Sequence, residues 1–318
     1  MVRKAVGQVS LVEALLPAAF GSNQRLERIA SQVDWVPIET LLQSMRQAPT
    51  GRPAYPPLVQ LKALLLQQWY RLSDRDLEEA LADRLSFRRF CGLGLEDAVP
   101  DATTISRFRI DLAEGGLAEE VFDALNAQFE QRGLVIKTGT MIDATLVEAD
   151  VKRPPMREGE VSTMDPTAGF TRRGQRSFFG YKAHLAVDHG TDLIRKAILT
   201  SADIGESIAA DALICGDEAA VLADKAYESM ARRDALAEAG ITDRIMHRRH
   251  QAKRSPSWHK WMNVAVAPLR GQIEKIFGTM KRRYLYRRVR YRSLERNRCQ
   301  LWLLCAAMNL RRADQLTG

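Results

Sequence analysis

The sequence lacks most features that mark a secreted, membrane-bound or zinc-stabilised protein. Only four of its 318 residues are cysteine, no two of them form a CxxC pair, and no Cys/His cluster has zinc spacing. The apolar runs around residues 61–66 and 301–308 are far too short to span a bilayer. The N-terminal stretch is broken by Glu13 and makes a poor signal peptide. We therefore expect reduced, partly buried thiols in a soluble protein of the cytoplasm.

What the sequence contains is the composition of an ordinary globular protein. Hydrophobic residues make up 46% and charged residues 27% of the chain, and a chain of 318 residues can bury a substantial core without cross-links. Global disorder, collagen-like repeats and a disulfide scaffold are therefore excluded. The length suggests two domains, or one large domain with an appendage.

Positive charge is concentrated in one part of the chain. The whole chain has a net charge of +8, but residues 244–298 contain 17 Lys and Arg residues and two acids, a local charge of +15. Such a run lacks the alternating acids of a salt-bridged surface, so we favour phosphate binding over a solvated helix face. The candidates for contacts with nucleic acid are Arg282, Arg283, Arg287, Arg288 and Arg290.

The first part of the chain, residues 1–135, is predicted to be an all-helical domain. Apolar periodicity and capping residues predict helices over residues 58–70, 74–82, 104–112 and 117–131. Short helices joined by tight turns fit a helix-turn-helix module, in which Arg107 and Arg109 would face DNA. They fit a small dimerisation bundle equally well, so both interpretations remain open.

After residue 137 the pattern changes to short β-rich segments, followed by alternating helices and strands. The predicted strands cover residues 139–147, 180–188, 193–200, 219–223 and 241–246. The predicted helices cover residues 206–213, 229–239, 266–284 and 294–312. This order indicates an α/β domain over residues 136–318, a mixed sheet flanked by helices. Its stretch rich in Pro, Gly and charge, residues 150–177, is predicted to be a mobile insertion loop.

Three carboxylates occupy unusual positions in this domain. Asp143 interrupts an apolar strand, Asp224 follows the end of another, where open sheets bind ligands, and Glu274 lies on the penultimate helix. Arg270 and Lys281 share a helix face with Glu274 by their spacing. Each acid alone has a structural explanation: a hydrogen bond in the sheet for Asp143, a helix cap for Asp224, and an ion pair with Arg270 for Glu274.

Taken together, the three carboxylates predict a metal site. Three hard oxygen ligands beside a cationic surface can hold two Mg²⁺ ions about 3.5–4 Å apart, an arrangement suited to phosphodiester chemistry. The absence of Cys/His ligand sets favours Mg²⁺ or Mn²⁺ over zinc. The sequence therefore predicts two bound Mg²⁺ ions, with Mn²⁺ as the possible substitute.

The carboxylates lie within longer motifs that occur in a fixed order. The motifs cover residues 104–109, 141–145, 179–184, 223–227, 270–281 and 289–292. Together they resemble a bacterial insertion-sequence transposase of the D-D-E type, in the large group that includes insertion sequence five. The sequence departs from that family at Ala226, where glycine is frequent, and at Ala267, where tyrosine is frequent.

The resemblance implies a ribonuclease-H-like core in which Asp143, Asp224 and Glu274 are catalytic residues and metal ligands. It implies a DNA transposase that binds the terminal inverted repeats of its own element, cleaves DNA and transfers the strand. Because two ends must be cut and joined together, a homodimer or larger synaptic assembly on double-stranded DNA is expected. Candidates for further DNA contacts are Arg270, Lys281, Lys225, Tyr227 and His184.

Two rival functions remain at this point. One is a catalytically silent, transposase-derived protein that binds DNA as a repressor or scaffold, although the three intact acids argue against it. The other is a ribonuclease-H-like nuclease that cuts DNA without strand transfer. Both share the expected fold and the expected DNA partner, so only an assay of cutting and joining separates them.

Overall fold

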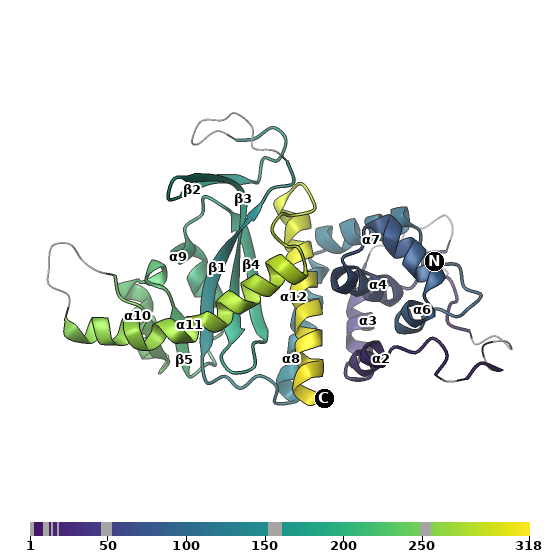
Figure 1. The fold of residues 1–318 in the computed structure, drawn as a ribbon, viewed down its shortest axis with the longest axis horizontal. Helices are drawn as coiled ribbons and strands as arrows, with labels where there is room; N and C mark the ends of the chain where they lie inside the picture. The colour runs from purple at the N-terminus through teal and green to yellow at the C-terminus, as the bar shows by residue number, and fades with distance from the viewer. Residues whose placement is uncertain are drawn as a thin grey trace. The chain divides into compact units, whose positions relative to one another are not determined.

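The computed structural model describes residues 3–8, 13, 15–17, 19–45, 53–151, 161–248 and 256–318. Backbone contacts divide the chain into two units (Figure 1). Unit 1 comprises residues 1–131 and 302–318, and unit 2 comprises residues 132–301. The division differs from the expected one, because the last residues of the chain group with the N-terminal helices.

Unit 1 is helical, and its helices begin at residues that the sequence marks as caps. The helices are α2 (Gln24–Ser31), α3 (Val36–Leu42), α4 (Pro57–Tyr70), α5 (Asp74–Asp83), α6 (Leu85–Cys91), α7 (Ala102–Glu114), α8 (Leu117–Gln131) and the second part of α12 (Leu294–Thr317). Ser73 and Asp76 form a reciprocal capping box at the start of α5. The Asp101 carboxylate accepts the Thr104 N–H at 2.7 Å at the start of α7. The all-helical N-terminal region is confirmed.

The second part of α12 is held in unit 1 by one buried apolar face and by polar contacts. Trp69 Nε1 donates to the Ala307 carbonyl oxygen at 2.8 Å. The Arg28 guanidinium forms two bonds to the Asp314 carboxylate, at 2.8 and 3.1 Å. Helical periodicity located α12 itself, but it could not reveal which helices its apolar face would contact.

Six strands form one mixed sheet in unit 2. They are β1 (Thr140–Glu148), β2 (Gly169–Arg173), β3 (Arg176–Asp188), β4 (Ile194–Ser201), β5 (Ala220–Ala223) and β6 (Thr242–Ile245). Strand β3 pairs antiparallel with β1, β2 and β4, whereas β1 pairs with β5 and β5 pairs with β6 in parallel. The order β4-β3-β1-β5-β6 is the ribonuclease-H-like arrangement that the resemblance implies.

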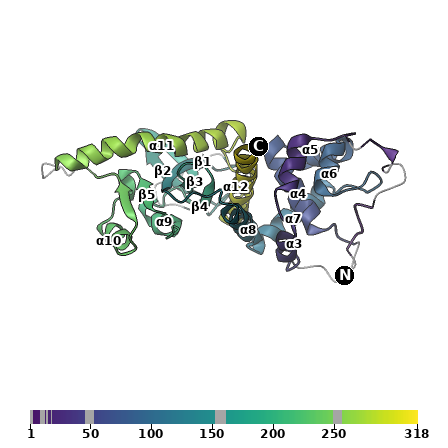
Figure 2. The same ribbon diagram turned by 90° about the horizontal axis from the view of Figure 1, so that it is seen from below.

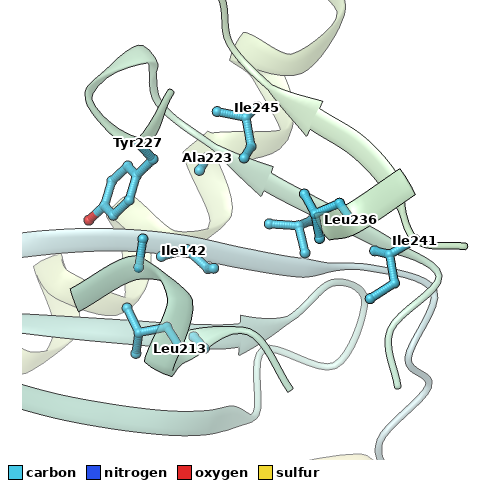
Figure 3. Close-up of a cluster of buried hydrophobic side chains, with 10 residues drawn as sticks. Ile142, Leu213, Ala223, Tyr227, Leu236, Ile241 and Ile245 are labelled. Carbon is cyan, nitrogen blue, oxygen red and sulfur yellow. The ribbon is translucent and has the colours of Figure 1, made fainter. Parts of the chain in front are cut away.

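Helices cover both faces of this sheet. Figure 2 shows α11 (Ser257–Arg283) along one face and α9 (Glu206–Leu213) and α10 (Met230–Glu238) on the other. The core under α9 and α10 is apolar and includes Ile142, Leu213, Ala223 and Leu236 (Figure 3). Because Ile142 and Ala223 point into this core, the strands β1 and β5 are fixed with defined inward and outward faces.

Part of the segment predicted to be a mobile loop is ordered instead. Strand β2 and the start of β3 form a hairpin, and Asp165 is completely buried. The Asp165 carboxylate accepts the Tyr181 hydroxyl at 2.7 and 2.8 Å and the Thr167 hydroxyl at 3.0 Å. The polar composition of this stretch did not reveal the buried Asp165 carboxylate, because a buried hydrogen-bonded carboxylate has the same sequence pattern as a solvated one. Residues 152–160 lie outside the described residues.

The cysteines form no cross-links. Cys91, Cys299 and Cys305 are buried, Cys215 is half-buried, and all four are free thiols, as expected. Burial raises the pKa of the Cys91 thiol to about 12 and that of Cys215 to about 11, so both thiols are protonated at neutral pH.

Among the helices described, none combines the length and the apolar character needed to cross a bilayer.

Gly180 allows β3 to lie against the end of β1. Its φ is +154°, and a Cβ atom there would lie 2.3 Å from the Val147 carbonyl oxygen. We predict that Gly180→Ala lowers the free energy of unfolding by more than about 1 kcal/mol, measured by chemical denaturation. Gly271→Ala is the control, because its Cβ would meet open space in α11; equal stabilities of the two variants would contradict the prediction.

Candidate active site

Asp143 and Asp224 are brought side by side by the pairing of two parallel strands. In the register of β1 and β5, Ile142 lies opposite Ala223, and the next residue of each segment is the aspartate. Ile142 points into the core under α9, so Asp143 projects from the other face, against which α11 packs. Strand β5 ends at Ala223 while β1 continues to Glu148, and this leaves an open edge at the carboxyl ends of the strands.

Glu274 reaches the same place from α11. The three carboxylates of Asp143, Asp224 and Glu274 line one cleft with a volume of about 410 Å³. The Asp143 carboxylate accepts the Ala144 N–H at 2.8 Å. The Asp224 carboxylate accepts the Lys225 N–H and caps the short 3-10 turn η1 (Lys225–Tyr227). The cap that was one explanation for Asp224 is therefore present, and the carboxylate also faces the cleft.

The three cleft carboxylates are more widely spaced than the ligands of a single ion. Within the described part of the chain, the residues whose ligand atoms all lie within 4.8 Å are Cys215, Asp217 and Glu218, outside the cleft. There Arg195 pairs with both carboxylates and Lys137 pairs with Asp217, so bound cations would compete with existing ion pairs. Among the described residues, Asp143, Asp224 and Glu274 therefore do not form a cluster as close as that one.

Three further charged residues line the cleft, Arg172, Lys182 and Glu206, and none of them was a predicted site residue. Lys182 is 8% exposed and donates to the Ile204 carbonyl oxygen at 2.6 Å. Burial lowers the pKa of Lys182, and the charges of Glu206 and Asp203 oppose that shift. Glu206 lies in the first turn of α9 and lines the cleft as a fourth carboxylate. A lysine inside an apolar strand was the available signal for Lys182, whereas Glu206 resembled an ordinary acid at a helix start.

The basic segment (residues 281–292) borders the open edge of β1. The Glu148 N–H donates to the Arg287 carbonyl oxygen at 2.9 Å, and the Val289 N–H donates to the Glu148 carbonyl oxygen at 2.8 Å. The side chains of Arg282, Arg283, Arg287 and Arg288 are exposed, and those of Lys281 and Arg290 are half-buried. Arg288 forms an exposed ion pair with Glu148 at 3.3 Å. The cations therefore lie next to the edge that opens into the cleft.

Two other predicted phosphate contacts flank the carboxylates in sequence. Lys225 is exposed and directly follows Asp224. Arg270 lies one helical turn before Glu274 in α11, but its side chain is outside the described residues. The ion pair between Arg270 and Glu274 that the sequence offered as an alternative is therefore not among the described contacts.

Two predicted DNA contacts are corrected by burial. Tyr227 has no exposed surface and belongs to the apolar core below the sheet. His184 is also completely buried, and its Nε2 lies 3.0 Å from the Thr200 hydroxyl. Burial and the nearby charge of Lys182 lower the pKa of His184 to about 4, so the ring is neutral at physiological pH. Both residues support the strands beneath the site and cannot touch DNA from these positions.

Arg109 is corrected in the same way, whereas Arg107 is not. Arg109 is 6% exposed and forms an ion pair with Asp74 on α5 and a hydrogen bond of 3.3 Å to Gln67 on α4. Arg107 is exposed on α7. Only Arg107 of the two is therefore placed where it could contact DNA.

Two family models match the chain. A transposase domain (DUF772) matches residues 16–111, and a transposase DDE domain matches residues 136–310. The chain belongs to the DDE transposase family. Among solved structures, this transposase is similar to the piggyBac transposase synaptic complex with hairpin DNA, with a TM-score of 0.44 and 10% identity over 91% of this chain and 72% of that chain. It is also similar to the Mos1 transposase paired-end complex, with a TM-score of 0.19 and 12% identity over 76% and 81% of the two chains.

We predict that Arg109 stabilises unit 1 and does not read DNA sequence. Arg109→Ala removes the charged partner of the Asp74 and Gln67 side chains, so the free energy of unfolding should fall by about 2 kcal/mol or more. Arg107→Ala, the exposed control on the same helix, should change it by less than about 0.5 kcal/mol. Urea denaturation measures both values, and a stable Arg109→Ala variant would show that the buried ion pair contributes nothing.

Proposed function

We propose that this transposase is encoded by an insertion sequence of the group that includes insertion sequence five. It binds the terminal inverted repeats of its element, cleaves the DNA there and joins the freed end to target DNA. The observation that supports this proposal is the meeting of Asp143, Asp224 and Glu274 at one cleft bordered by the basic segment. Carboxylates alone would repel DNA, and the neighbouring cations supply the attraction for phosphates.

The donor set of the cleft fits Mg²⁺, with Mn²⁺ as a substitute. Asp143, Asp224 and Glu274 would hold two ions, because carboxylates are the hard oxygen ligands that these ions prefer. Among the described residues that line the cleft, none is a cysteine or a histidine, which agrees with this preference. When bound, the ions supply stabilisation of the negative charge that develops at the scissile phosphodiester.

The chain's own cations would place the phosphates. The burial of Lys182 would strengthen a contact between its ammonium group and a non-bridging phosphate oxygen. Lys225 and the basic segment would hold the flanking phosphates of the same strand. Arg270 and Lys281, which share a helix face with Glu274 by sequence spacing, would keep the scissile phosphate in line with the attacking oxygen.

The proposed reaction has two steps. Water attacks the phosphodiester at the element end, and the bond from phosphorus to the 3′ oxygen breaks to leave a 3′-hydroxyl and a 5′-phosphate. That 3′-hydroxyl then attacks a phosphodiester of the target and displaces a target 3′-hydroxyl. Both ends must react together, so the proposed active form is a homodimer or larger assembly on double-stranded DNA in the cytoplasm.

We predict that Asp143→Asn, Asp224→Asn and Glu274→Gln each lower the rate of cleavage of an end-labelled terminal repeat by at least about 100-fold. Binding of the same DNA should persist, because each variant removes a metal ligand but leaves every Lys and Arg side chain in place. Glu238→Gln, an exposed acid outside the cleft, is the control. Full cleavage by any of the three variants would remove that residue from the proposed site.

The same assay with a target plasmid separates the rival functions. Wild-type protein should give joined products in which element ends are covalently linked to the target. Cleaved ends without joined products would favour the nuclease alternative. Binding without cleavage would favour the catalytically silent alternative.

We predict that the basic segment contributes non-specific affinity for DNA. Changing Arg287, Arg288 and Arg290 together to Ala should weaken binding to any duplex and make the slope of log K against log salt shallower by up to about 3, because each phosphate contact releases counterions. The matched Arg→Lys triple variant keeps the charge and should keep the slope. A slope unchanged by the Ala variant would show that these arginines are only solvated.

A further inference from the structure

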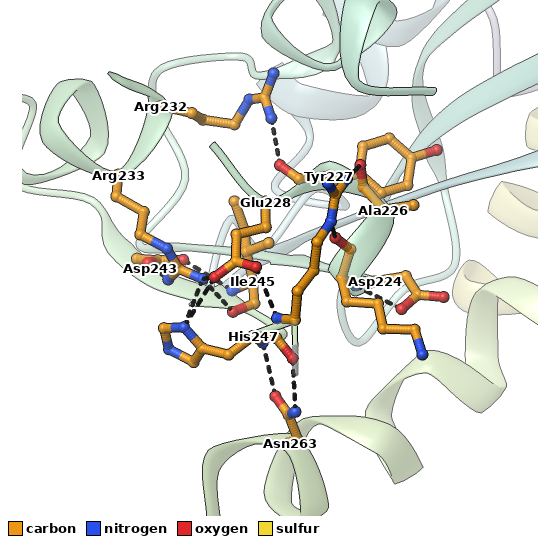
Figure 4. Close-up of polar contacts among 12 residues, drawn as sticks. Asp224, Ala226, Tyr227, Glu228, Arg232, Arg233, Asp243, Ile245, His247 and Asn263 are labelled. Carbon is orange, nitrogen blue, oxygen red and sulfur yellow. Dashed lines mark hydrogen bonds and ion pairs between the residues drawn. The ribbon is translucent and has the colours of Figure 1, made fainter. Parts of the chain in front are cut away.

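The turn that follows Asp224 is held by two arginines. Arg248 Nε donates to the Lys225 carbonyl oxygen at 2.8 Å, and its Nη2 donates to the Ala226 carbonyl oxygen at 3.0 Å. Arg232 Nη1 donates to the next carbonyl, that of Tyr227 (Figure 4). A 3-10 turn of three residues has little stability of its own. These bonds therefore determine where the turn lies, and with it the Asp224 carboxylate at its start.

The same turn is tied to the backbone that follows β6. Glu228 directly follows the turn, and its Oε2 accepts the Arg248 N–H at 2.7 Å. Its Oε1 lies 3.1 Å from His247 Nδ1 and 3.3 Å from an Arg233 guanidinium nitrogen. Glu228 and His247 are shielded from water, so these charge-assisted bonds fix the geometry more firmly than surface contacts would.

His247 contacts three side chains of α11. Its ring stacks on His259, with 3.8 Å between the ring centroids, and lies edge-on to Trp258 at 4.8 Å. The His247 N–H donates to Asn263 Oδ1 at 2.8 Å, and Asn263 Nδ2 donates to the His247 carbonyl oxygen at 3.0 Å. Asn263 and Glu274 lie on the same helix, with Pro268 between them. Because Pro268 removes one backbone bond of the helix, the contacts of Asn263, His259 and Trp258 with His247 help to hold its first half in place.

We propose that Arg248, Glu228, His247 and Asn263 form a positioning network, which fixes the Asp224 carboxylate relative to Glu274 and thereby sets the spacing at which both hold divalent metal. The inference rests on the proposed function. Arg248 lies in the basic part of the chain, where the sequence alone favours a phosphate contact. Its guanidinium is instead directed to backbone carbonyls of the Asp224 turn, and this is the observation that distinguishes a positioning residue from a DNA contact.

The test uses the full chain and measures Mn²⁺ binding by electron paramagnetic resonance titration without DNA. Arg248→Ala and Asn263→Ala should each raise the Mn²⁺ dissociation constant about 10-fold or more, the usual effect of losing a partner that orients metal ligands. The Mn²⁺ concentration for half-maximal cleavage should rise by the same factor. Arg248→Lys should behave as Arg248→Ala, because an ammonium group cannot reproduce the planar fork that bridges two carbonyls.

The controls separate this proposal from the one on which it rests. Arg244→Ala removes an exposed cation from β6 and should leave Mn²⁺ affinity unchanged. If Asp224→Asn weakens Mn²⁺ binding but Arg248→Lys or Asn263→Ala retains wild-type affinity, the network is refuted and the metal site stands. If Asp143→Asn and Asp224→Asn bind Mn²⁺ as well as the wild type does, the proposed function itself fails. Circular dichroism melting confirms that each variant is folded, which the exposure of Arg248 leads us to expect.

Discussion

The parallel pairing of β1 with β5 is the constraint on which the candidate site depends. It is a backbone interaction, and three of the paired residues, Ile142, Val221 and Ala223, bury their side chains in the apolar core below the sheet. Like charges repel when they approach, so two aspartates on neighbouring segments would separate if only side chains held them. Burial of the apolar core around Ile142 and Ala223 keeps the two aspartates together. The arrangement of the cleft depends on that burial.

Arginine has two distinct uses in this protein. Arg109, Arg232 and Arg248 direct their guanidinium groups to carboxylates or carbonyl oxygens of the chain itself. Arg283 and Arg287 instead have exposed side chains. The planar guanidinium suits both uses, because it binds backbone carbonyls, carboxylates and phosphates with the same set of donors. Net charge alone therefore overstates the surface that is available to nucleic acid.

Local features of the fold were predictable from the sequence, because local physics determines them. The helices that start at Ser73 and Asp101 are specified by caps within three residues, and the strand of Asp143 by an alternating apolar pattern. Asp143 was a candidate because a carboxylate is unfavourable in a strand, and Asp224 because it follows the carboxyl end of one, where open sheets bind ligands. The spacing of α11 likewise placed Glu274 on a face with cations.

Features that depend on distant partners were not predictable. Tyr227 and Arg109 are residue types that often contact DNA. Tyr227 is instead buried in the apolar core and Arg109 is paired with Asp74, and these partners are not adjacent to them in sequence. Asp165 lies in a stretch rich in polar residues, Pro and Gly, yet it is buried and its carboxylate accepts the Tyr181 hydroxyl. In each case the side chain offers the same chemistry to two environments, and tertiary packing selects one of them.

The open edge of β1 also bears on strand addition by another molecule. Unpaired N–H and C=O groups along a strand edge are a template for adding a strand from another molecule. On the described part of the chain, this edge is bounded by β5 at one end and by the pairing of Glu148 with Arg288 at the other. The gap over residues 144–147 spans roughly 13 Å of strand, short for stable strand addition. The candidate site can thus remain open at a sheet edge that offers little room for edge-to-edge pairing.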